Sequence, residues 1–319
     1  MGMAPILISF VVVAAFASVS VRAVDVITYT FQNTTSLLAA QAQGRFNSTS
    51  PLVVVLEPGI YGLSEVLSFT APSLELRGPS AEIICDGANS AFQLSITCSL
   101  LMLGLSVSNC SGILPAVNID SPFSSLCDST ITLDSLRFHG NTAGALAIVA
   151  NTSNITLSGC SFDSNSLRAV TPFNNHAAFI SAEQGTIAMR DVTFSSNGIN
   201  SNLTGANVMQ AICMGMDCRF TTSNSSWNNN KAVSSIQGFG SVGIFGSAWV
   251  GNTGENTLSV IQATGVPPDG PGIYNVEISG STFTQNYGSL HGVLLYDCRS
   301  ALVRGSTFSG NRAGSEGVR

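Results

Sequence analysis

The feature that most constrains the fold is a repeat in which an aromatic residue is followed three positions later by asparagine. The motif occurs seven times, at uneven intervals along the chain. The aromatic members are Phe138, Phe162, Phe194, Trp227, Trp249, Phe283 and Phe308. The asparagines are Asn141, Asn165, Asn197, Asn230, Asn252, Asn286 and Asn311. Units this short cannot bury an apolar face alone, so they are expected to stack on one another.

The positions before each aromatic alternate between apolar and polar. Thirteen of the fourteen residues seven and five positions earlier are apolar, whereas six of the seven residues four positions earlier are polar, with Phe245 as the exception. This period of two is typical of a half-buried strand. Glycine stands three positions earlier in four units, where a tight bend is expected: Gly159, Gly246, Gly280 and Gly305. A turn follows at the asparagine, and a further apolar stretch often follows the turn.

Three short strands per unit predict an all-β fold, a right-handed parallel β-helix, with inserted loops in the three longest units. Those units begin at Phe162, Phe194 and Trp249. Stacking would place equivalent side chains about 4.8 Å apart. The sequence therefore predicts an internal stack of the seven aromatics and a ladder of the seven asparagines, whose amides both donate and accept hydrogen bonds. The alternative, a β-sandwich, does not require the same residue at the same place in every unit.

Residues 1–23 are expected to be a signal peptide. Their apolar run extends from Ile6 to Val21 and ends in a small-residue cleavage site after Ala23. The alternative is a membrane anchor, but the run is shorter than the roughly 20 residues that a span needs. We therefore expect no integral membrane segment in the mature chain.

Residues 24–50 are predicted to form an N-terminal cap, and residues 51–319 the β-helix. The segment from Ser36 to Phe46 favours a short helix, with Thr34, Thr35 or Ser36 as its N-cap. The chain ends soon after Asn311, in the middle of a unit, and this predicts a β-helix truncated at its C-terminus.

The cysteines and the glycosylation sequons predict an extracellular protein, either secreted or at the cell surface. The eight cysteines allow four disulfides, whose connectivity the sequence leaves open; Cys213 and Cys218 are the expected local pair, and Cys160 is a good candidate for a buried thiol. Seven Asn-x-Ser/Thr sequons are candidate glycosylation sites, at Asn33, Asn47, Asn109, Asn151, Asn154, Asn202 and Asn224. None of the ladder asparagines lies in a sequon. The net charge of −6 argues against a nucleic-acid partner.

The start of the chain resembles the pectin-lyase-like superfamily of right-handed parallel β-helices. The similar features are a helix, the aliphatic strand Leu52 to Leu56, and then Pro58-Gly59-Ile60-Tyr61. In that superfamily the helix covers the open end of the first coil. The aromatic-x-x-Asn units also resemble the repeats of polymorphic outer membrane proteins. These resemblances imply a fold, but not an activity.

Enzymes of that superfamily act on acidic polysaccharides, yet their catalytic motifs are absent here. The chain lacks the polygalacturonase-like motifs Asn-Thr-Asp, Asp-Asp and Gly-His-Gly, and it lacks the pectinesterase-like motifs Gln-Asp-Thr and Asp-Phe-x-x-Gly. It also lacks the clustered carboxylates of a pectate-lyase-like calcium site, because no two acidic residues are adjacent or one apart. His139 could act as a general base, but the favoured interpretation is a turn residue that faces solvent. The sequence therefore predicts no catalytic residue, no cofactor and no metal ligand.

Three functional hypotheses follow. The first is a non-catalytic extracellular β-helix that binds a polysaccharide or another matrix component. The second is a lyase or hydrolase of uronate polymers, which requires a groove lined by carboxylates and arginine on stacked coils. The third is the passenger region of a larger membrane-associated protein.

Overall fold

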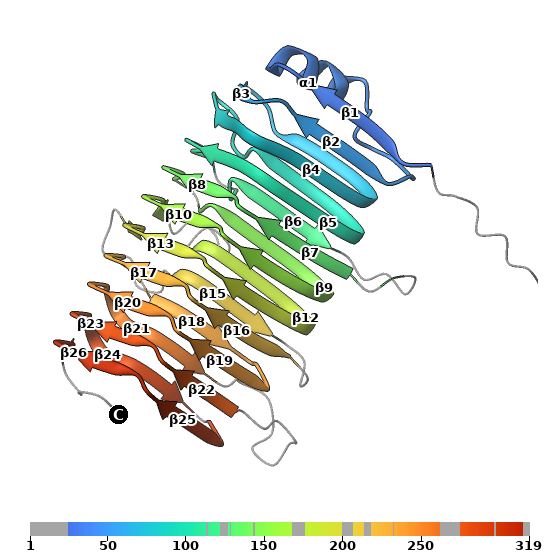
Figure 1. Ribbon diagram of the computed structural model, residues 1–319. Coiled ribbons are helices and arrows are strands. Elements are labelled where there is room, and N and C mark those ends of the chain that lie inside the picture. Colours follow the sequence, from blue (N-terminus) through green and yellow to red (C-terminus); the bar gives the residue numbers. More distant parts are fainter. Residues whose placement is uncertain are drawn as a thin grey trace, which may run out of the picture.

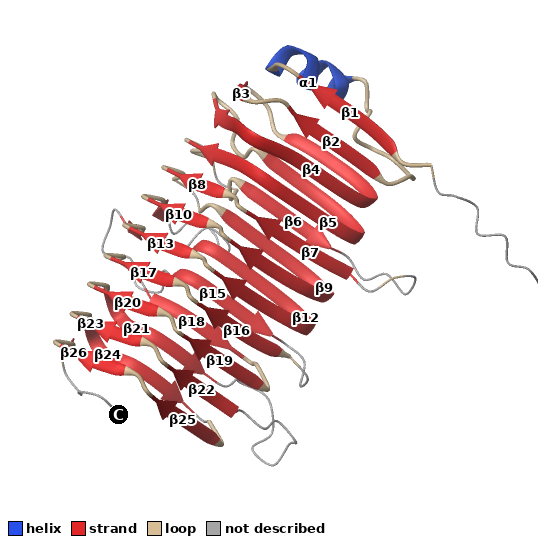
Figure 2. Ribbon diagram, viewed as in Figure 1, coloured by secondary structure: helices blue, strands red, loops and turns tan. Residues whose placement is uncertain are grey.

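The computed structural model describes residues 25–112, 114–121, 127, 129–142, 144–167, 176–199, 207–213, 218–231, 233–261, 275–296 and 298–314. Strands make up most of these residues, and they contain one helix, α1 (Thr34–Ala42) (Figure 2). The all-β class predicted from the sequence is therefore confirmed. The predicted signal peptide lies outside the described residues.

The strands form three series that alternate along the chain, and every pairing is parallel. The first series comprises β1 (Ile27–Phe31), β2 (Leu52–Leu56), the middle parts of β4 (Leu67–Cys85) and β5 (Phe92–Ser108), β7 (Ser129–Asp134), the second halves of β9 (Leu146–Ser158) and β12 (His176–Arg190), β16 (Arg219–Ser223), β19 (Ser241–Phe245), β22 (Asn275–Ser279) and β25 (Ser300–Arg304).

The second series carries the repeated aromatics. It comprises β3 (Gly59–Leu63), the ends of β4 and β5, β8 (Arg137–His139), β10 (Ser161–Asp163), β13 (Thr193–Ser195), β17 (Ser226–Asn228), β20 (Ala248–Val250), β23 (Thr282–Thr284) and β26 (Thr307–Ser309).

In the repeats that carry a ladder asparagine, the third series comes after the turn at that residue. It comprises the first parts of β4, β5, β9 and β12, with β6 (Val117–Ser121), β15 (Asn207–Cys213), β18 (Val233–Gln237), β21 (Thr253–Ile261), β24 (Tyr287–Tyr296) and β27 (Arg312–Ala313). A separate pair of short strands, β11 (Ser166–Leu167) and β14 (Gly198–Ile199), directly follows two of the ladder asparagines.

Each strand pairs with the equivalent strand of the next repeat, so residues that are far apart in the sequence become neighbours. Phe138 pairs in register with Phe162, and Phe162 pairs with Phe194. Figure 1 shows the resulting stack, which runs from α1 and β1 at one end to β25 and β26 at the other. Residues that repeat along the sequence therefore lie next to one another in the stack.

Helix α1 lies beside the first strands of the stack (Figure 1). It buries Leu37 and Ala40, the two positions that face the strands. The side chain of Asn33 caps it, because Oδ1 accepts the Ser36 N–H at 3.0 Å. The predicted caps at positions 34 to 36 were therefore wrong by one to three positions. With nine residues, α1 is far shorter than the roughly 20 that a membrane-spanning helix needs, and the described residues contain no other helix.

The repeated aromatic rings lie parallel inside the stack. The distances between successive ring centroids, from Phe138 to Phe308, are 4.8, 4.6, 5.5, 4.2, 4.8 and 4.8 Å. Six of the seven rings are buried, and Phe308 in the last repeat is 48% exposed. Burial of each of the other six rings stabilises the fold by roughly 1.5–3 kcal/mol.

The repeated asparagines are joined by their side-chain amides. In each pair, Nδ2 donates to Oδ1 of the asparagine one repeat later, over 2.9 to 3.1 Å. The second Nδ2 hydrogen goes to a backbone carbonyl of the preceding repeat, as from Asn197 to Phe162 O at 2.8 Å. The same Oδ1 also accepts a backbone N–H, as from Asn165 to Asn197 at 3.0 Å. Four hydrogen bonds therefore saturate the side-chain amide at each of the five inner positions of the row, Asn165, Asn197, Asn230, Asn252 and Asn286.

Toward the N-terminus, a disulfide-bonded cysteine takes the place of the next asparagine in the row. The N–H of Cys110 donates to Oδ1 of Asn141 at 3.0 Å, and Cys110 is bonded to Cys85 of the preceding repeat. Two further disulfides join Cys98 to Cys127 and Cys213 to Cys218. Cys160 is a buried free thiol, and burial raises its pKa to about 11.

A second row of hydrogen bonds, which the sequence analysis did not predict, lies two residues before the aromatics. Oγ of Ser247 accepts the N–H of Ser225 at 3.2 Å, and Oγ of Ser281 accepts the N–H of Ser247 at 3.3 Å. Ser306 extends the row, because its Oγ accepts the N–H of Ser281 at 3.1 Å. These serines satisfy backbone donors at the bend between the first and second series.

The sequon asparagines differ in burial from the ladder asparagines. The described sequons at Asn33, Asn47, Asn109, Asn154 and Asn224 are exposed, and Asn151 is partly exposed. The sequon at Asn202 lies outside the described residues. Glycosylation of these sites stays a prediction.

Candidate functional site

The short strands of the second series set the direction of their side chains. In β8 the middle residue, Phe138, is buried, so Arg137 and His139 on either side of it both face outward. Asp163 has the same outward position in β10, and Ser195 has it in β13. The repeat that buries the aromatics therefore also displays the residues on either side of them.

Parallel register assembles these outward residues into two rows. In the first row, Glu82 pairs with Ser106, and Ser106 pairs with Arg137. The second row joins four residues from four strands, in the order Ser108, His139, Asp163 and Ser195. The two rows run side by side, because they flank the inward-facing column that contains Phe138.

His139 and Asp163 form a hydrogen-bonded pair. Nδ1 of His139 lies 3.0 Å from Oδ2 of Asp163. The carboxylate also accepts hydrogen bonds from the hydroxyls of Ser195 at 2.6 Å and Ser164 at 3.2 Å. The Ser195 hydroxyl is the largest cause of a pKa of Asp163 below its ordinary value; partial burial opposes the shift, and His139 and Ser164 add to it. An ionised Asp163 favours the imidazole tautomer with its hydrogen on Nδ1, which leaves Nε2 as an acceptor.

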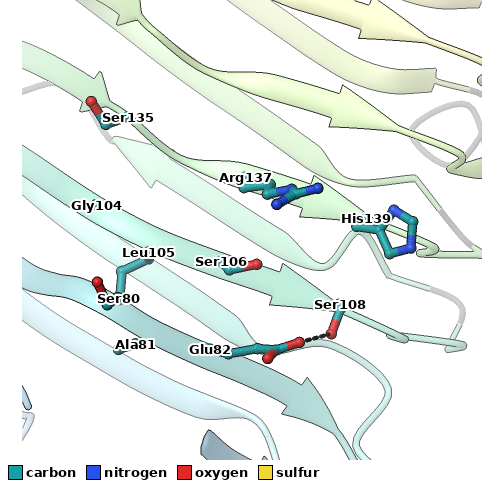
Figure 3. A pocket seen from close by; sticks show the side chains of 10 residues that line it. All are labelled: Ser80, Ala81, Glu82, Gly104, Leu105, Ser106, Ser108, Ser135, Arg137 and His139. Atoms are coloured by element: carbon teal, nitrogen blue, oxygen red, sulfur yellow. Dashed lines mark hydrogen bonds between the residues drawn. The ribbon is translucent and has the colours of Figure 1, made fainter. Parts of the chain in front are cut away.

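A groove of about 470 Å³ lies over this surface and contains residues of both rows (Figure 3). Glu82, Ser106, Arg137 and His139 line it, together with backbone and small side chains of the bends. Oγ of Ser108 donates to the Glu82 carboxylate at 3.5 Å, a long bond that leaves most of the acceptor capacity of Glu82 open. Within the described part of the chain, the Arg137 guanidinium has no carboxylate partner.

The arrangement differs in part from the sequence prediction for His139. The residue is exposed, as expected, but it ends a strand instead of lying in a turn, and it lines the groove. Asp163, Glu82 and Arg137 were not singled out from the sequence. A signal was available, since Arg137, His139 and Asp163 all stand next to a repeated aromatic. Only the register between repeats brings them together.

The other two histidines lie on the third strand series, away from β8. His176 is buried on β12 with its ring 5.3 Å from that of Phe179, and His291 belongs to β24. Among the described residues, no three His, Cys, Asp or Glu side chains form a group that could hold a metal ion.

Comparison with known proteins gives distant structural neighbours. No family model matches the sequence, and no curated protein matches it. The PL6 family alginate lyase AlyGC aligns with 90% of this chain at 13% identity and a TM-score of 0.42, and this chain covers 39% of its length.

Two further solved structures align over most of both chains. A mannuronic acid specific polysaccharide family 6 lyase from human gut microbiota has 13% identity and a TM-score of 0.38, over 92% of this chain and 83% of its own. PfbA, a surface adhesin of Streptococcus pneumoniae, has 10% identity and a TM-score of 0.29, over 88% of this chain and 86% of its own. Likeness at this level carries no argument about activity.

Proposed function

We propose that this chain is an extracellular right-handed parallel β-helix that binds an acidic polysaccharide in the groove beside Arg137. The parallel pairing of every repeat with the next supports the β-helix. Three disulfides and the exposed sequons support an oxidising, extracellular location. Residues 1–23 would then be the cleaved signal peptide, residues 24–50 the cap that contains α1, and residues 51–319 the β-helix.

The observation that carries the proposal is the guanidinium of Arg137 in the groove, which has no carboxylate partner among the described residues. A guanidinium presents a planar fork of donors that matches the two oxygens of a carboxylate. Ser106 adds a hydroxyl one repeat away, and Glu82 adds an acceptor two repeats away, so sugar hydroxyls find partners on either side of the charge. A uronate polymer lying along the stack offers both carboxylates and hydroxyls to such a surface.

Binding of polygalacturonate and alginate to the purified full chain tests the proposal, by calorimetry and by retardation in gels that contain the polymer. Arg137→Ala should weaken binding about tenfold or more, because a charged hydrogen bond is lost without replacement. Arg137→Lys should recover part of the loss, since the charge is kept but the fork is not. Arg190→Ala is the matched control, because Arg190 is an exposed arginine on the first series, outside the groove. Its Nε lies 3.2 Å from Oδ2 of Asp191.

Two results would contradict binding in the groove. One is equal affinity of the Arg137→Ala and wild-type chains. The other is a loss of affinity for neutral dextran on Arg137→Ala as large as the loss for the acidic polymers, which would leave the charge of the guanidinium without a role. An affinity that falls with added salt is also expected, because salt screens an exposed charge.

The His139–Asp163 pair favours a second candidate function, cleavage of the bound uronate polymer by β-elimination. Nε2 of His139 would take the proton next to the sugar carboxylate, the glycosidic C–O bond would break, and the leaving oxygen would gain a proton from solvent. Arg137 would stabilise the negative charge that develops on the carboxylate. The ultraviolet absorbance of the unsaturated product measures this reaction. A wild-type chain that binds the polymer without producing this absorbance would leave binding as the function.

A further inference from the structure

One outward position breaks the repeat pattern of the first strand series. Four residues before each aromatic, six units carry a polar residue, and the seventh carries Phe245. The structure places Phe245 on the outer face at the end of β19, where it is 36% exposed. Its in-register neighbours are Ser223 on β16 and Ser279 on β22. These two strands lie on either side of β19 in the stack (Figure 1). A large aromatic ring therefore lies on a strand face between two small hydroxyl side chains.

Gly243, two residues earlier on the same strand, makes room for the ring. A Cβ at Gly243 would lie 2.5 Å from Cε2 and 2.8 Å from Cζ of Phe245, so the ring occupies the space of the missing side chain. Gly243 is not among the glycines with a left-handed backbone, so its conformation does not require glycine. Its in-register neighbours, Thr221 and Glu277, both carry side chains. Because residue 243 is a glycine, the ring of Phe245 can lie back along the strand and cover the backbone there.

Polar groups surround this ring. Oε1 of Glu277 lies 2.7 Å from a terminal nitrogen of Arg304, one repeat further along the stack. Thr221, Ser223 and Ser279 complete the border. An apolar ring with a border of hydroxyls and an ion pair differs from the core of a protein interface, which is depleted in charged residues. It matches an amphipathic ligand, one that has an apolar face and polar edges.

We propose that Phe245 is a stacking platform for a pyranose ring of a neutral glycan. The C–H groups on one face of the sugar would pack on the aromatic ring, whose face is electron-rich. The sugar hydroxyls at the edge would exchange hydrogen bonds with the Glu277–Arg304 pair and with the serines. The platform belongs to the first strand series and the groove to the second, so this proposal does not rest on the proposed function.

Calorimetric titration of the full chain with β-linked hexaoses of glucose, xylose and mannose tests the platform. We expect at least one of the three to bind. Phe245→Ala should weaken that binding about tenfold, the size of one lost aromatic contact. Phe245→Trp should retain it, because the larger ring keeps the stacking surface. Gly243→Ala should give intermediate affinity, because its Cβ displaces the ring and leaves the chemistry of residue 245 unchanged.

The matched control is Tyr296→Ala, which removes an exposed aromatic, 62% accessible, on the third strand series. It should leave hexaose affinity at the wild-type value. Circular dichroism and hydrogen exchange show whether each variant is folded, and Gly243→Ala provides a second route if Phe245→Ala is not. Failure of all three hexaoses to bind the wild-type chain would overturn the proposal. Equal affinity of the Phe245→Ala and wild-type chains would do the same.

Discussion

Replacement of Asn197 by alanine tests the energetic role of the asparagine row. The Asn197 side chain takes part in four hydrogen bonds. Its Nδ2 donates to Phe162 O at 2.8 Å and to Asn230 Oδ1 at 3.1 Å. Its Oδ1 accepts the backbone N–H of Asn165 at 3.0 Å and the side-chain Nδ2 of Asn165 at 2.9 Å. Asn197 is fully buried, so water cannot replace these partners in the folded chain.

The expected loss follows from those four bonds. Each contributes about 1 kcal/mol net, so their removal should lower the free energy of unfolding by about 4 kcal/mol. The N–H of Asn165 and the carbonyl of Phe162 also lose their side-chain partner, and a buried polar group without a partner adds to the cost. A loss of this size is a large part of the roughly 5–15 kcal/mol that stabilises a typical domain.

Urea denaturation of the wild-type chain, Asn197→Ala and Asn228→Ala measures the effect. Asn228 is the matched control, because it is only partly buried. Within the described part of the chain its side chain makes one hydrogen bond, from Nδ2 to Oγ of Ser226 at 3.3 Å. Its replacement should change stability by less than about 0.5 kcal/mol, as at other surface sites. Because a repeat array can open locally, hydrogen exchange should also be followed in the peptide that contains Asn165, which should lose protection in Asn197→Ala.

A loss for Asn197→Ala no larger than that for Asn228→Ala would refute the reasoning. Unchanged exchange around Asn165 would refute it independently, because the N–H of that residue would then have kept an acceptor. Either result would mean that contacts other than the amide row hold the repeats together.

Two further predictions concern titratable groups. Burial raises the pKa of the Cys160 thiol to about 11, so iodoacetamide should label it in urea but not in the native chain, as peptide mapping by mass spectrometry would show. The hydroxyl of Ser195 lowers the pKa of Asp163 in the folded chain, so the stabilisation by Asp163 is present above its unfolded pKa and is lost as the pH falls through the folded value. The difference in free energy of unfolding between wild type and Asp163→Asn should therefore shrink below about pH 4. In a Ser195→Ala background, the same Asp163→Asn substitution should have a smaller effect already at neutral pH. A difference that grows in acid would contradict this.

The interior of the stack follows from sequence because every repeat requires it. A buried aromatic ring and a buried amide find suitable partners at the equivalent positions of the neighbouring units, so the same residue types recur at the same place in most units. The serine row had the same signal, since Ser225, Ser247, Ser281 and Ser306 all stand two residues before an aromatic. It was not predicted because the other three repeats carry Leu136, Cys160 and Val192 there.

The helix cap shows where local chemistry leaves several answers. Asparagine, serine and threonine all cap helices, and four such residues follow one another from Asn33 to Ser36. The first of them serves as the cap because α1 already begins at Thr34, the residue after it. Leu37 and Ala40 of α1 are buried where the helix meets the first strands, and no local pattern specifies contacts with residues so distant in the sequence.

The groove lay beyond sequence reasoning for a different reason. Glu82 lies far from Arg137 and His139 in the sequence, and none of the three belongs to a motif of known chemistry. Their proximity depends on register across three repeats of unequal length. An outward side chain also has no obligatory partner, so its type is free to vary from one repeat to the next without loss of the fold.

The inward side chains therefore stabilise the fold, and the outward side chains remain available for recognition. The inward columns repeat because a change in one unit leaves its neighbours with an orphaned amide or a cavity. The outward columns carry no such constraint, so a departure from their usual residue types costs little and needs another explanation. Arg137 with His139 is one such departure on the second series, and Gly243 with Phe245 is another on the first. Recognition by this protein is therefore best sought where the outward columns break their own pattern.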